Sequence, residues 1–301
     1  MGLILASTLS FSCMSALARV SSHAFRPDAL MFLRCAIQSA CILPWIWVFW
    51  PRAGMRWATV RAHFVRGAVG VVSMWFLYSA LGHLPLGMVS LLTMTSALWA
   101  GVLAHLFLGE RQALGHLSFA GVALVGVAIT LWPEPGDWKL NPWGVAAALA
   151  AGFSMGTAQM LVRQMGQSFG TREIVFWFGV AGMLFSAPAY FFKPQWPHTP
   201  QEVVWILGLG ITALGGQLLM TRGFRYCTTL PGSLCVLFGS VWNVLLGLVF
   251  LGELPPARFW IGGTLAAGGI GVWMVSAAPP EARRLLVNRA ALIIGRAVGR
   301  I

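Results

Sequence analysis

Leu108-Gly109-Glu110 ends one long apolar segment, and Leu251-Gly252-Glu253 ends another one 143 positions later. Each copy carries a tryptophan, Trp99 or Trp242, eleven residues before its glutamate. A segment that recurs at a fixed offset indicates a duplicated unit. Because the recurring unit is apolar over most of its length, the pattern predicts two copies of one bundle of membrane-spanning helices.

The composition also indicates a membrane protein. Of the 301 residues, 58% are hydrophobic and 9% are charged, with a mean hydropathy of +0.77, whereas soluble domains carry about 25% charged residues. A helix needs roughly 20 apolar residues to cross the hydrocarbon layer, and stretches of that length recur along the chain. We therefore expect ten spans, at residues 2–19, 29–50, 67–84, 86–108, 113–132, 143–162, 173–192, 203–221, 232–252 and 259–277.

The polar, proline-rich segment 133–142 divides these spans into two sets of five, so we predict that it is a linker. Because five is odd, the second copy must enter the membrane from the opposite side. The sequence thus predicts an all-α membrane protein of about ten transmembrane helices in two inverted five-helix repeats, residues 1–132 and 143–277. The basic tail, residues 278–301, is expected to form an interfacial cytoplasmic helix.

The net charge of +12 is explained by topology. With the N-terminus placed in the cytoplasm, most basic residues, Arg66 among them, fall on cytoplasmic connections or on the tail. The opposite connections hold only Arg19, Arg26, Lys139, Lys193 and Arg258. This positive-inside bias predicts a multi-pass protein of the bacterial inner membrane with both termini cytoplasmic. The expected partners are a small-molecule substrate and membrane lipids, with anionic lipid at the basic face; nucleic acid is not expected, and the chain is expected to be a monomer or a homodimer.

The sequence holds no recognisable enzyme motif. Neither lysine follows the glycine loop of a Walker A motif, HExxH and GxSxG are absent, and the five cysteines form no CxxC pair. We therefore expect no enzyme, no cofactor and no metal site. All eight acidic residues fall at span ends or in connections, which argues against a pump that carries a proton on a buried carboxylate.

Polar and aromatic residues within the spans are the candidate substrate-binding groups. Arg34 is the most informative, because an arginine inside a span costs on the order of 3 kcal/mol. We expect it to bind a carboxylate or phosphate of the substrate; the alternative is that it reaches outward or braces helix carbonyls. The other candidates, each of which could instead serve helix packing or interfacial anchoring, are Tyr78, Trp99, Gln159, Gln217, Arg222, Trp242 and Asn243.

Several segments resemble a known family. The segments are Arg66-Gly67, Tyr78-Ser-Ala-Leu-Gly-His-Leu-Pro-Leu-Gly87, Leu108-Gly-Glu-Arg111, Gly216-Gln-Leu-Leu-Met-Thr-Arg-Gly-Phe-Arg-Tyr226 and Phe250-Leu-Gly-Glu-Leu-Pro255. Together with Phe32-Leu33-Arg34 they are similar to EamA-type members of the drug/metabolite transporter superfamily. Two departures are Leu237-Phe238-Gly239-Ser240, where relatives often carry a Glu-Tyr pair, and Thr95-Ser96-Ala97-Leu98, where the family usually has a proline.

The resemblance implies a central cavity between the two halves and transport by alternating access. We therefore expect a secondary transporter or facilitator of small zwitterionic or anionic metabolites, amino-acid-like or nucleoside-like. The alternatives are a lipid flippase, a non-transporting accessory membrane subunit and a membrane enzyme, although no clustered catalytic group supports the last.

Overall fold

The computed structural model describes residues 2–49, 57–109, 141–227, 229–236, 239–254 and 259–265, with a few isolated positions besides. The chain divides into two compact units, Met1–Glu110 with Pro133–Pro256, and Arg111–Trp132 with Ala257–Ile301. In the second unit the described residues include a helical stretch at 259–265. The predicted span 113–132, most of the linker 133–142 and the tail 278–301 lie outside the described residues. All that follows concerns the first unit.

In the described part of this unit every regular element is a helix. The helices are α1 (Gly2–Ser21), α2 (Pro27–Phe49), α3 (Trp57–His83), α4 (Leu86–Thr93), α5 (Thr95–Leu108), α7 (Pro142–Gly166), α8 (Thr171–Phe192), α9 (Pro200–Tyr226), α10 (Thr229–Val236) and α11 (Gly239–Leu251). Six helical segments among the described residues are long and apolar enough to cross a membrane. The all-helical, multi-span class expected from the sequence is therefore confirmed.

Two boundaries differ from the sequence prediction. The third helix begins at Trp57, ten residues before the expected start at 67, so Arg66 lies well inside α3 and not in a connection. The predicted span 86–108 consists of α4 and α5, which meet at Met94. There the hydrogen bonds from Met94 N to Leu91 O and from Ala97 N to Met94 O, both 3.2 Å, follow the tighter i to i−3 pattern.

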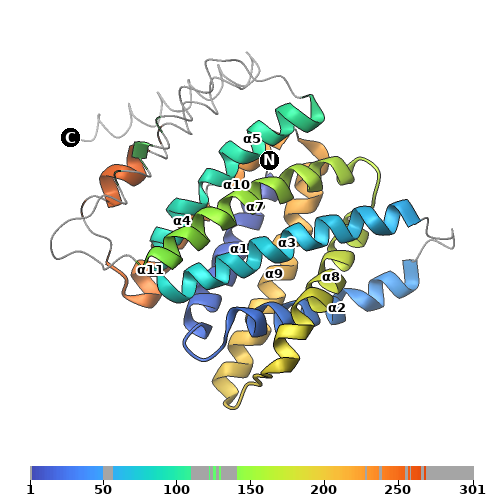
Figure 1. Ribbon diagram of the computed structural model, residues 1–301, viewed down its shortest axis with the longest axis horizontal. Helices are drawn as coiled ribbons and strands as arrows, with labels where there is room; N and C mark the ends of the chain where they lie inside the picture. Colours follow the sequence, from blue (N-terminus) through green and yellow to red (C-terminus); the bar gives the residue numbers. More distant parts are fainter. Residues whose placement is uncertain are drawn as a thin grey trace. The chain divides into compact units, whose positions relative to one another are not determined.

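Helices distant in sequence pack against one another. The main pairs are α1 with α9, α3 with α7, and α2 with α8, followed by α5 with α7 and α3 with α8 (Figure 1). Small residues permit this close packing. A Cβ added at Gly67 of α3 would overlap Ala181 of α8, and one added at Gly216 of α9 would overlap the ring of Phe11 in α1. Glycine allows close backbone approach between membrane helices in this way.

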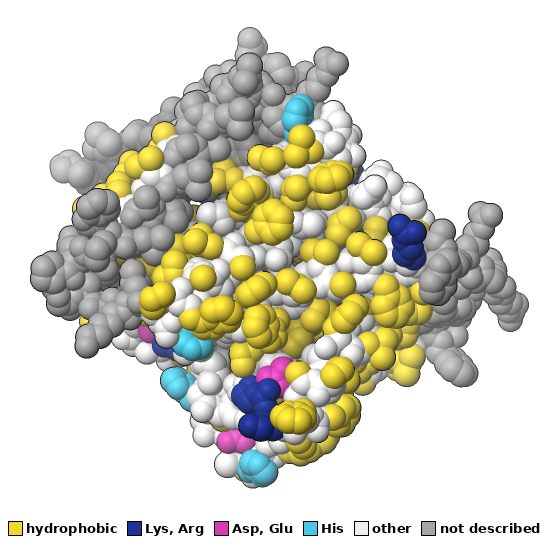
Figure 2. Space-filling view, viewed as in Figure 1, with side chains coloured by type: hydrophobic (Ala, Val, Ile, Leu, Met, Phe, Trp, Pro, Cys, Tyr) yellow, Lys and Arg dark blue, Asp and Glu magenta, His cyan; other side chains and the backbone are white. Residues whose placement is uncertain are grey.

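The surface of this unit is mainly apolar. Figure 2 shows a face covered by hydrophobic side chains, with the charged side chains gathered near its lower and outer edges. Exposed residues such as Leu184, Phe185, Val204 and Ile211 lie on α8 and α9. Because lipid tails, unlike water, are an apolar solvent, such a surface is suited to a membrane protein.

The duplicated Leu-Gly-Glu motif is a helix stop. Gly109 follows α5 with φ of 67°, and Gly252 follows α11 with φ of 64°; both lie in the left-handed region. After α11 the chain turns back so that Glu253 N donates to Gly247 O at 3.0 Å. Glycine is required at this position because a side chain is strained there. Both copies of the motif thus end a helix in the same local conformation.

Candidate functional site

A cavity lies among helices from both halves of the sequence. It has about 940 Å³ of empty space, which includes the part that opens to the outside. Its wall combines apolar side chains with serine and threonine hydroxyls, three amides and one arginine. The polar lining residues are Thr8, Ser12, Ser15, Arg66, Ser73, Ser90, Thr93, Ser96, Gln159, Gln217 and Asn243.

Among the described residues of this lining, Arg66 is the charged one. It projects from α3, its exposed fraction is 2%, and its guanidinium carbon lies 4.8 Å from the centre of the Phe178 ring. Gly70, one turn further along α3, leaves room for it, because a Cβ there would overlap both Arg66 and Phe178. Its Nε and Nη1 atoms are buried without a hydrogen-bond partner. Arg66 therefore has unused donors beside the cavity.

Arg34 contacts the same ring. It projects from α2, is fully buried, and its guanidinium carbon lies 5.2 Å from the centre of Phe178. Its Nη1 approaches Met31 Sδ at 3.9 Å, while Nε and Nη2 have no partner. Arg34 does not line the cavity, but Phe178, which both arginines contact, does. The two cations therefore share one aromatic partner at the cavity wall.

Three predicted amides meet at the cavity. Gln159 comes from α7, Gln217 from α9 and Asn243 from α11. Asn243 Nδ2 donates to Ser90 Oγ at 3.0 Å, which joins α11 to α4. The assigned amide oxygens of all three side chains are buried without a partner. All three residues belong to the second half of the sequence, and the fold of that half brings them to one space.

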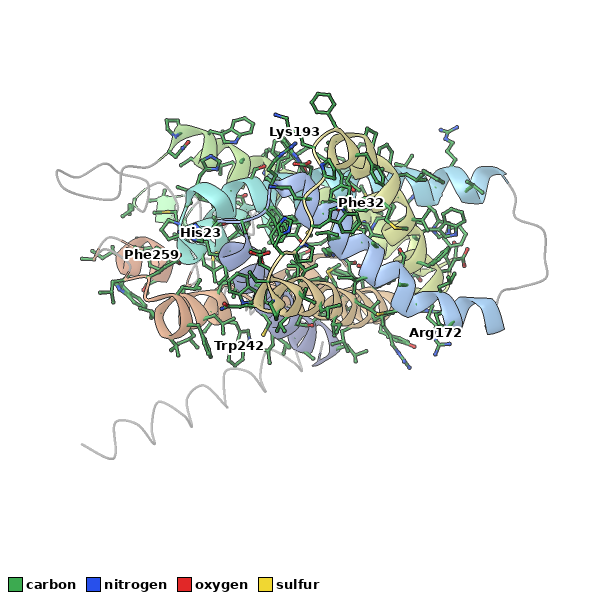
Figure 3. The ribbon with its side chains drawn as sticks, turned by 90° about the horizontal axis from the view of Figure 1, so that it is seen from below. His23, Phe32, Arg172, Lys193, Trp242 and Phe259 are labelled. Atoms are coloured by element: carbon green, nitrogen blue, oxygen red, sulfur yellow. The ribbon has the colours of Figure 1, made fainter. Side chains whose placement is uncertain are left out.

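The other predicted site residues lie elsewhere. Tyr78 is fully buried behind the wall, and its hydroxyl lies 3.7 Å from the sulfur of Met14, a lining residue. Trp99 and Trp242 have exposed fractions of 41% and 39% and are not in the lining; Figure 3 places Trp242 at the periphery of the helices. Arg222 is exposed on α9. That these three contact substrate stays a prediction.

Sequence reasoning missed Arg66. It was assigned to a cytoplasmic connection because the third span was expected to begin at Gly67. A signal was available, since Gly67 and Gly70 place small residues one and four positions after the arginine, where a neighbouring helix can approach and cover it. Gln38 was missed as well; its Nε2 donates to Val175 O at 2.9 Å and joins α2 to α8 beside Arg34.

An ion pair and hydrogen bonds link helix ends beside the cavity. Arg19 at the end of α1 donates from Nε to Glu253 Oε1 and from Nη1 to Leu81 O, both at 2.9 Å. Glu253 Oε2 also accepts from Leu86 N at 2.7 Å. Leu81 and Leu86 line the cavity, so this cluster lies at one of its ends. We call Arg19, Leu81, Leu86 and Glu253 the Arg19 clamp.

A second pair lies toward the N-terminal ends of α3 and α8. His63 Nε2 lies 3.1 Å from Glu173 Oε1, and the His63 ring packs near those of Phe169 and Trp177. His63 is one turn from Arg66 on α3. Glu173, the acidic residue of the first turn of α8, contacts His63, forms no ion pair with Arg66 and is not among the described lining residues.

The acidic residues of the described helices and of their ends all have partners outside the cavity lining. Asp28 pairs with Arg26 at 3.0 Å, Glu173 with His63, Glu253 with Arg19, and Glu202 accepts from His198 N at 2.8 Å. Within the described residues none of these carboxylates lines the cavity, and no group of three potential metal ligands occurs. The arrangement is a mainly apolar cavity with polar side chains and one arginine among its described lining residues, a combination suited to binding a small molecule.

Comparison with known proteins defines the class further. The EamA-like transporter family matches residues 1–132 and 142–275. The chain belongs to this family, and it is therefore a multi-pass membrane transporter and not an enzyme.

The chain is similar to several proteins that are named as transporters or exporters. It is 28% identical to the pseudopaline exporter CntI of Pseudomonas aeruginosa over 268 residues, which cover 88% of this chain and 92% of that protein. It is 22% identical to the riboflavin transporter of Vibrio cholerae, over 87% of this chain and 88% of the relative. It is also 28% identical to a probable terminal-alkyne amino-acid exporter of Streptantibioticus cattleyicolor, over 62% and 64% of the two chains.

A solved crystal structure shares the fold. It aligns with a TM-score of 0.70 over 94% of this chain and 97% of that chain, at 23% sequence identity. At this identity the likeness concerns the fold alone, and it agrees with the helical architecture described above.

Proposed function

We propose that this chain is a secondary transporter that moves small anionic or zwitterionic metabolites across the bacterial inner membrane by alternating access. Arg66 carries the proposal. It is a buried arginine in the lining of a small-molecule cavity, with free donors and no carboxylate from the described residues to neutralise it. Burying an unpaired charge is costly, so a substrate that supplies an acidic group gains strongly from binding there.

The relatives support transport but not a particular cargo. Their names mention pseudopaline, riboflavin and a terminal-alkyne amino acid, so a shared substrate is not implied. In our proposal Arg66 binds the acidic group, and Gln159, Gln217 and Asn243 hydrogen-bond the remaining polar atoms. Arg34 and Tyr78 support the wall from behind it. Amides serve as neutral donors and acceptors for such a purpose.

Two inverted repeats would provide the alternating access. If α1, α2, α3, α4 and α5 correspond to α7, α8, α9, α10 and α11, the packing of α1 with α9 corresponds to that of α7 with α3. The packing of α5 with α7 likewise corresponds to that of α11 with α1, and α2 with α8 corresponds to itself. Each of these helix pairs thus has an equivalent pair when every helix is replaced by its counterpart in the other half. Two inverted repeats require this equivalence.

Single contacts support the same correspondence. Arg19 Nη1 donates to Leu81 O at 2.9 Å, and Arg163 Nη1 donates to Phe224 O at 3.3 Å. Arg163 follows Arg19 by 144 positions and Phe224 follows Leu81 by 143, which matches the offset of the Leu-Gly-Glu motif. Equivalent contacts at equivalent positions favour two copies of one structural unit.

Counterflow into proteoliposomes tests the proposal. Purified protein is reconstituted into vesicles preloaded with unlabelled amino acids, nucleosides or organic anions, and uptake of the labelled solute is measured. We expect flux of at least one anionic or zwitterionic solute. Arg66→Gln should lower this flux by about tenfold or more, because it removes a charged hydrogen bond worth about 1.5–3 kcal/mol.

Two controls make the test specific. Arg66→Lys keeps the positive charge and should retain part of the flux, and Arg61→Gln removes an exposed arginine of the same helix and should leave the flux unchanged. Scrambling of phospholipid headgroups by folded protein without solute flux would favour a flippase instead. Folded protein with neither activity would contradict transport altogether.

A further inference from the structure

Two buried guanidinium groups lie on the same aromatic ring. Arg34 of α2 and Arg66 of α3 contact Phe178 of α8 at 5.2 and 4.8 Å from its centre. Both arginines have exposed fractions of 2% or less. The π electrons of the Phe178 ring attract both guanidinium groups. The ring carries no net charge, so it cannot neutralise either arginine.

Both arginines have buried nitrogen atoms without a hydrogen-bond acceptor. Arg34 Nε and Nη2, and Arg66 Nε and Nη1, have no partner. Asp28 at the start of α2 and Glu173 at the start of α8 contact Arg26 and His63 instead. Among the described residues, therefore, neither arginine forms an ion pair with a carboxylate, and one of the two, Arg66, lines the cavity.

The number of negative charges on the transported molecule decides whether both arginines can be neutralised. The two positive charges of Arg34 and Arg66 repel each other strongly where water is excluded. A ligand with one negative charge would neutralise only one of these two charges. A ligand with two negative charges would neutralise both cations. Arg66 lines the cavity and would contact the first acidic group directly. Arg34 contacts Phe178 but is not in the lining, so it would act on the second negative charge through its field.

We propose that the cargo is a doubly negative anion, with Arg34 as the residue that sets the preference for the second charge. This inference rests on the proposed function and narrows its substrate class. Two carboxylates or one phosphate monoester provide the required charge. The amides of Gln159, Gln217 and Asn243, which are neutral, are suited to hydrogen-bond the uncharged part of the same molecule.

Matched anions test the preference for two charges. Thermal unfolding of the full-length protein in detergent is followed against succinate and its mono-amide, succinamate, which differ by one charge at nearly equal size. A second arm compares methyl phosphate with dimethyl phosphate and distinguishes a phosphate from a dicarboxylate cargo. We expect a half-saturating concentration about tenfold lower for the doubly charged member of at least one pair.

Variants of Arg34 identify the origin of the preference. Arg34→Gln should bring the two members of the preferred pair to within about twofold of each other, while the affinity for the singly charged member stays nearly unchanged. Arg34→Lys, which keeps the charge, should retain the preference, and Arg61→Gln should behave as the unaltered protein. If Arg34→Gln does not fold, the comparison of the unaltered protein with Arg34→Lys still tests the charge preference.

The outcomes separate this inference from the function on which it rests. Equal affinity for both members of each pair would contradict the inference of a doubly negative substrate. The proposed transport of singly charged or zwitterionic solutes would remain possible. Binding of none of these anions would also overturn the inference. Absence of both anion binding and solute counterflow would remove the proposed function as well.

Discussion

At the residue scale, the site depends on small residues as much as on charged ones. Arg66 fits beside Phe178 because Gly70 has no side chain, and α3 approaches α8 because Gly67 lies against Ala181. Similarly, a Cβ at Gly182 of α8 would overlap the sulfur of Cys35, the residue after Arg34. Glycines thus determine how closely the helices that carry the two arginines can pack against α8.

Gly67→Ala should therefore destabilise the protein. Its new methyl group would overlap Ala181, and the two helices would have to separate. We expect the free energy of unfolding to fall by about 1–3 kcal/mol, measured by denaturant unfolding in detergent micelles. Gly82→Ala is the matched control in the same helix, because a Cβ there meets only Ser22 Cβ, at 3.9 Å, an ordinary contact distance. Equal stability of the two variants would argue against close contact between α3 and α8.

At the element scale, helix ends determine where the cavity stops. The left-handed glycine after α11 turns the chain so that Glu253 can reach both Arg19 at the end of α1 and Leu86 N at the start of α4. The Arg19 clamp therefore joins helices from both sequence halves. Because the Arg19 and Glu253 side chains are only 20% and 15% exposed, solvent screens the pair incompletely, and it should contribute more than a surface pair.

A double-mutant cycle measures this contribution. Arg19→Ala and Glu253→Ala, singly and together, should give a coupling energy of about 1–3 kcal/mol, obtained from unfolding free energies. The pair of Arg26 and Asp28 is the comparison, since the Arg26 side chain is 41% exposed and its coupling should stay below about 1 kcal/mol. A coupling near zero for Arg19 and Glu253 would show that the clamp does not hold the helix ends together.

At the scale of the whole molecule, the proposed topology assigns each connection to one side of the membrane. The connection between α7 and α8 should be cytoplasmic, and that between α8 and α9 periplasmic, because the basic residues favour a cytoplasmic N-terminus. Ser168 and His198 are exposed residues of these two connections. They therefore allow the orientation to be tested.

Labelling of single cysteines tests the orientation. In a background with the five native cysteines replaced, His198→Cys should react with a membrane-impermeant maleimide in cells with a permeabilised outer membrane. Ser168→Cys should react only after the inner membrane is disrupted. Labelling of both positions from the same side would contradict the alternation of spans, and the reverse pattern would place the termini on the periplasmic side.

Part of the site was predictable from the sequence. Gln159, Gln217 and Asn243 were selected as uncharged polar residues within apolar spans, and all three line the cavity. Trp99 and Trp242 were selected for their symmetric positions, and in this structure they lie outside it. Position along a span is visible in the sequence, but the direction in which a side chain faces depends on neighbouring helices, because nearly every face of these helices is apolar.

The sequence by itself determined that this is a helical membrane protein with a duplicated motif, because apolar segment length and residue recurrence are local properties of the chain. Only the tertiary structure decided that Arg66 belongs to the site and shares Phe178 with Arg34. The three residues come from α3, α8 and α2, and their meeting depends on the close packing of helices from different halves. No local pattern encodes that packing, because the contacts arise between residues more than a hundred positions apart.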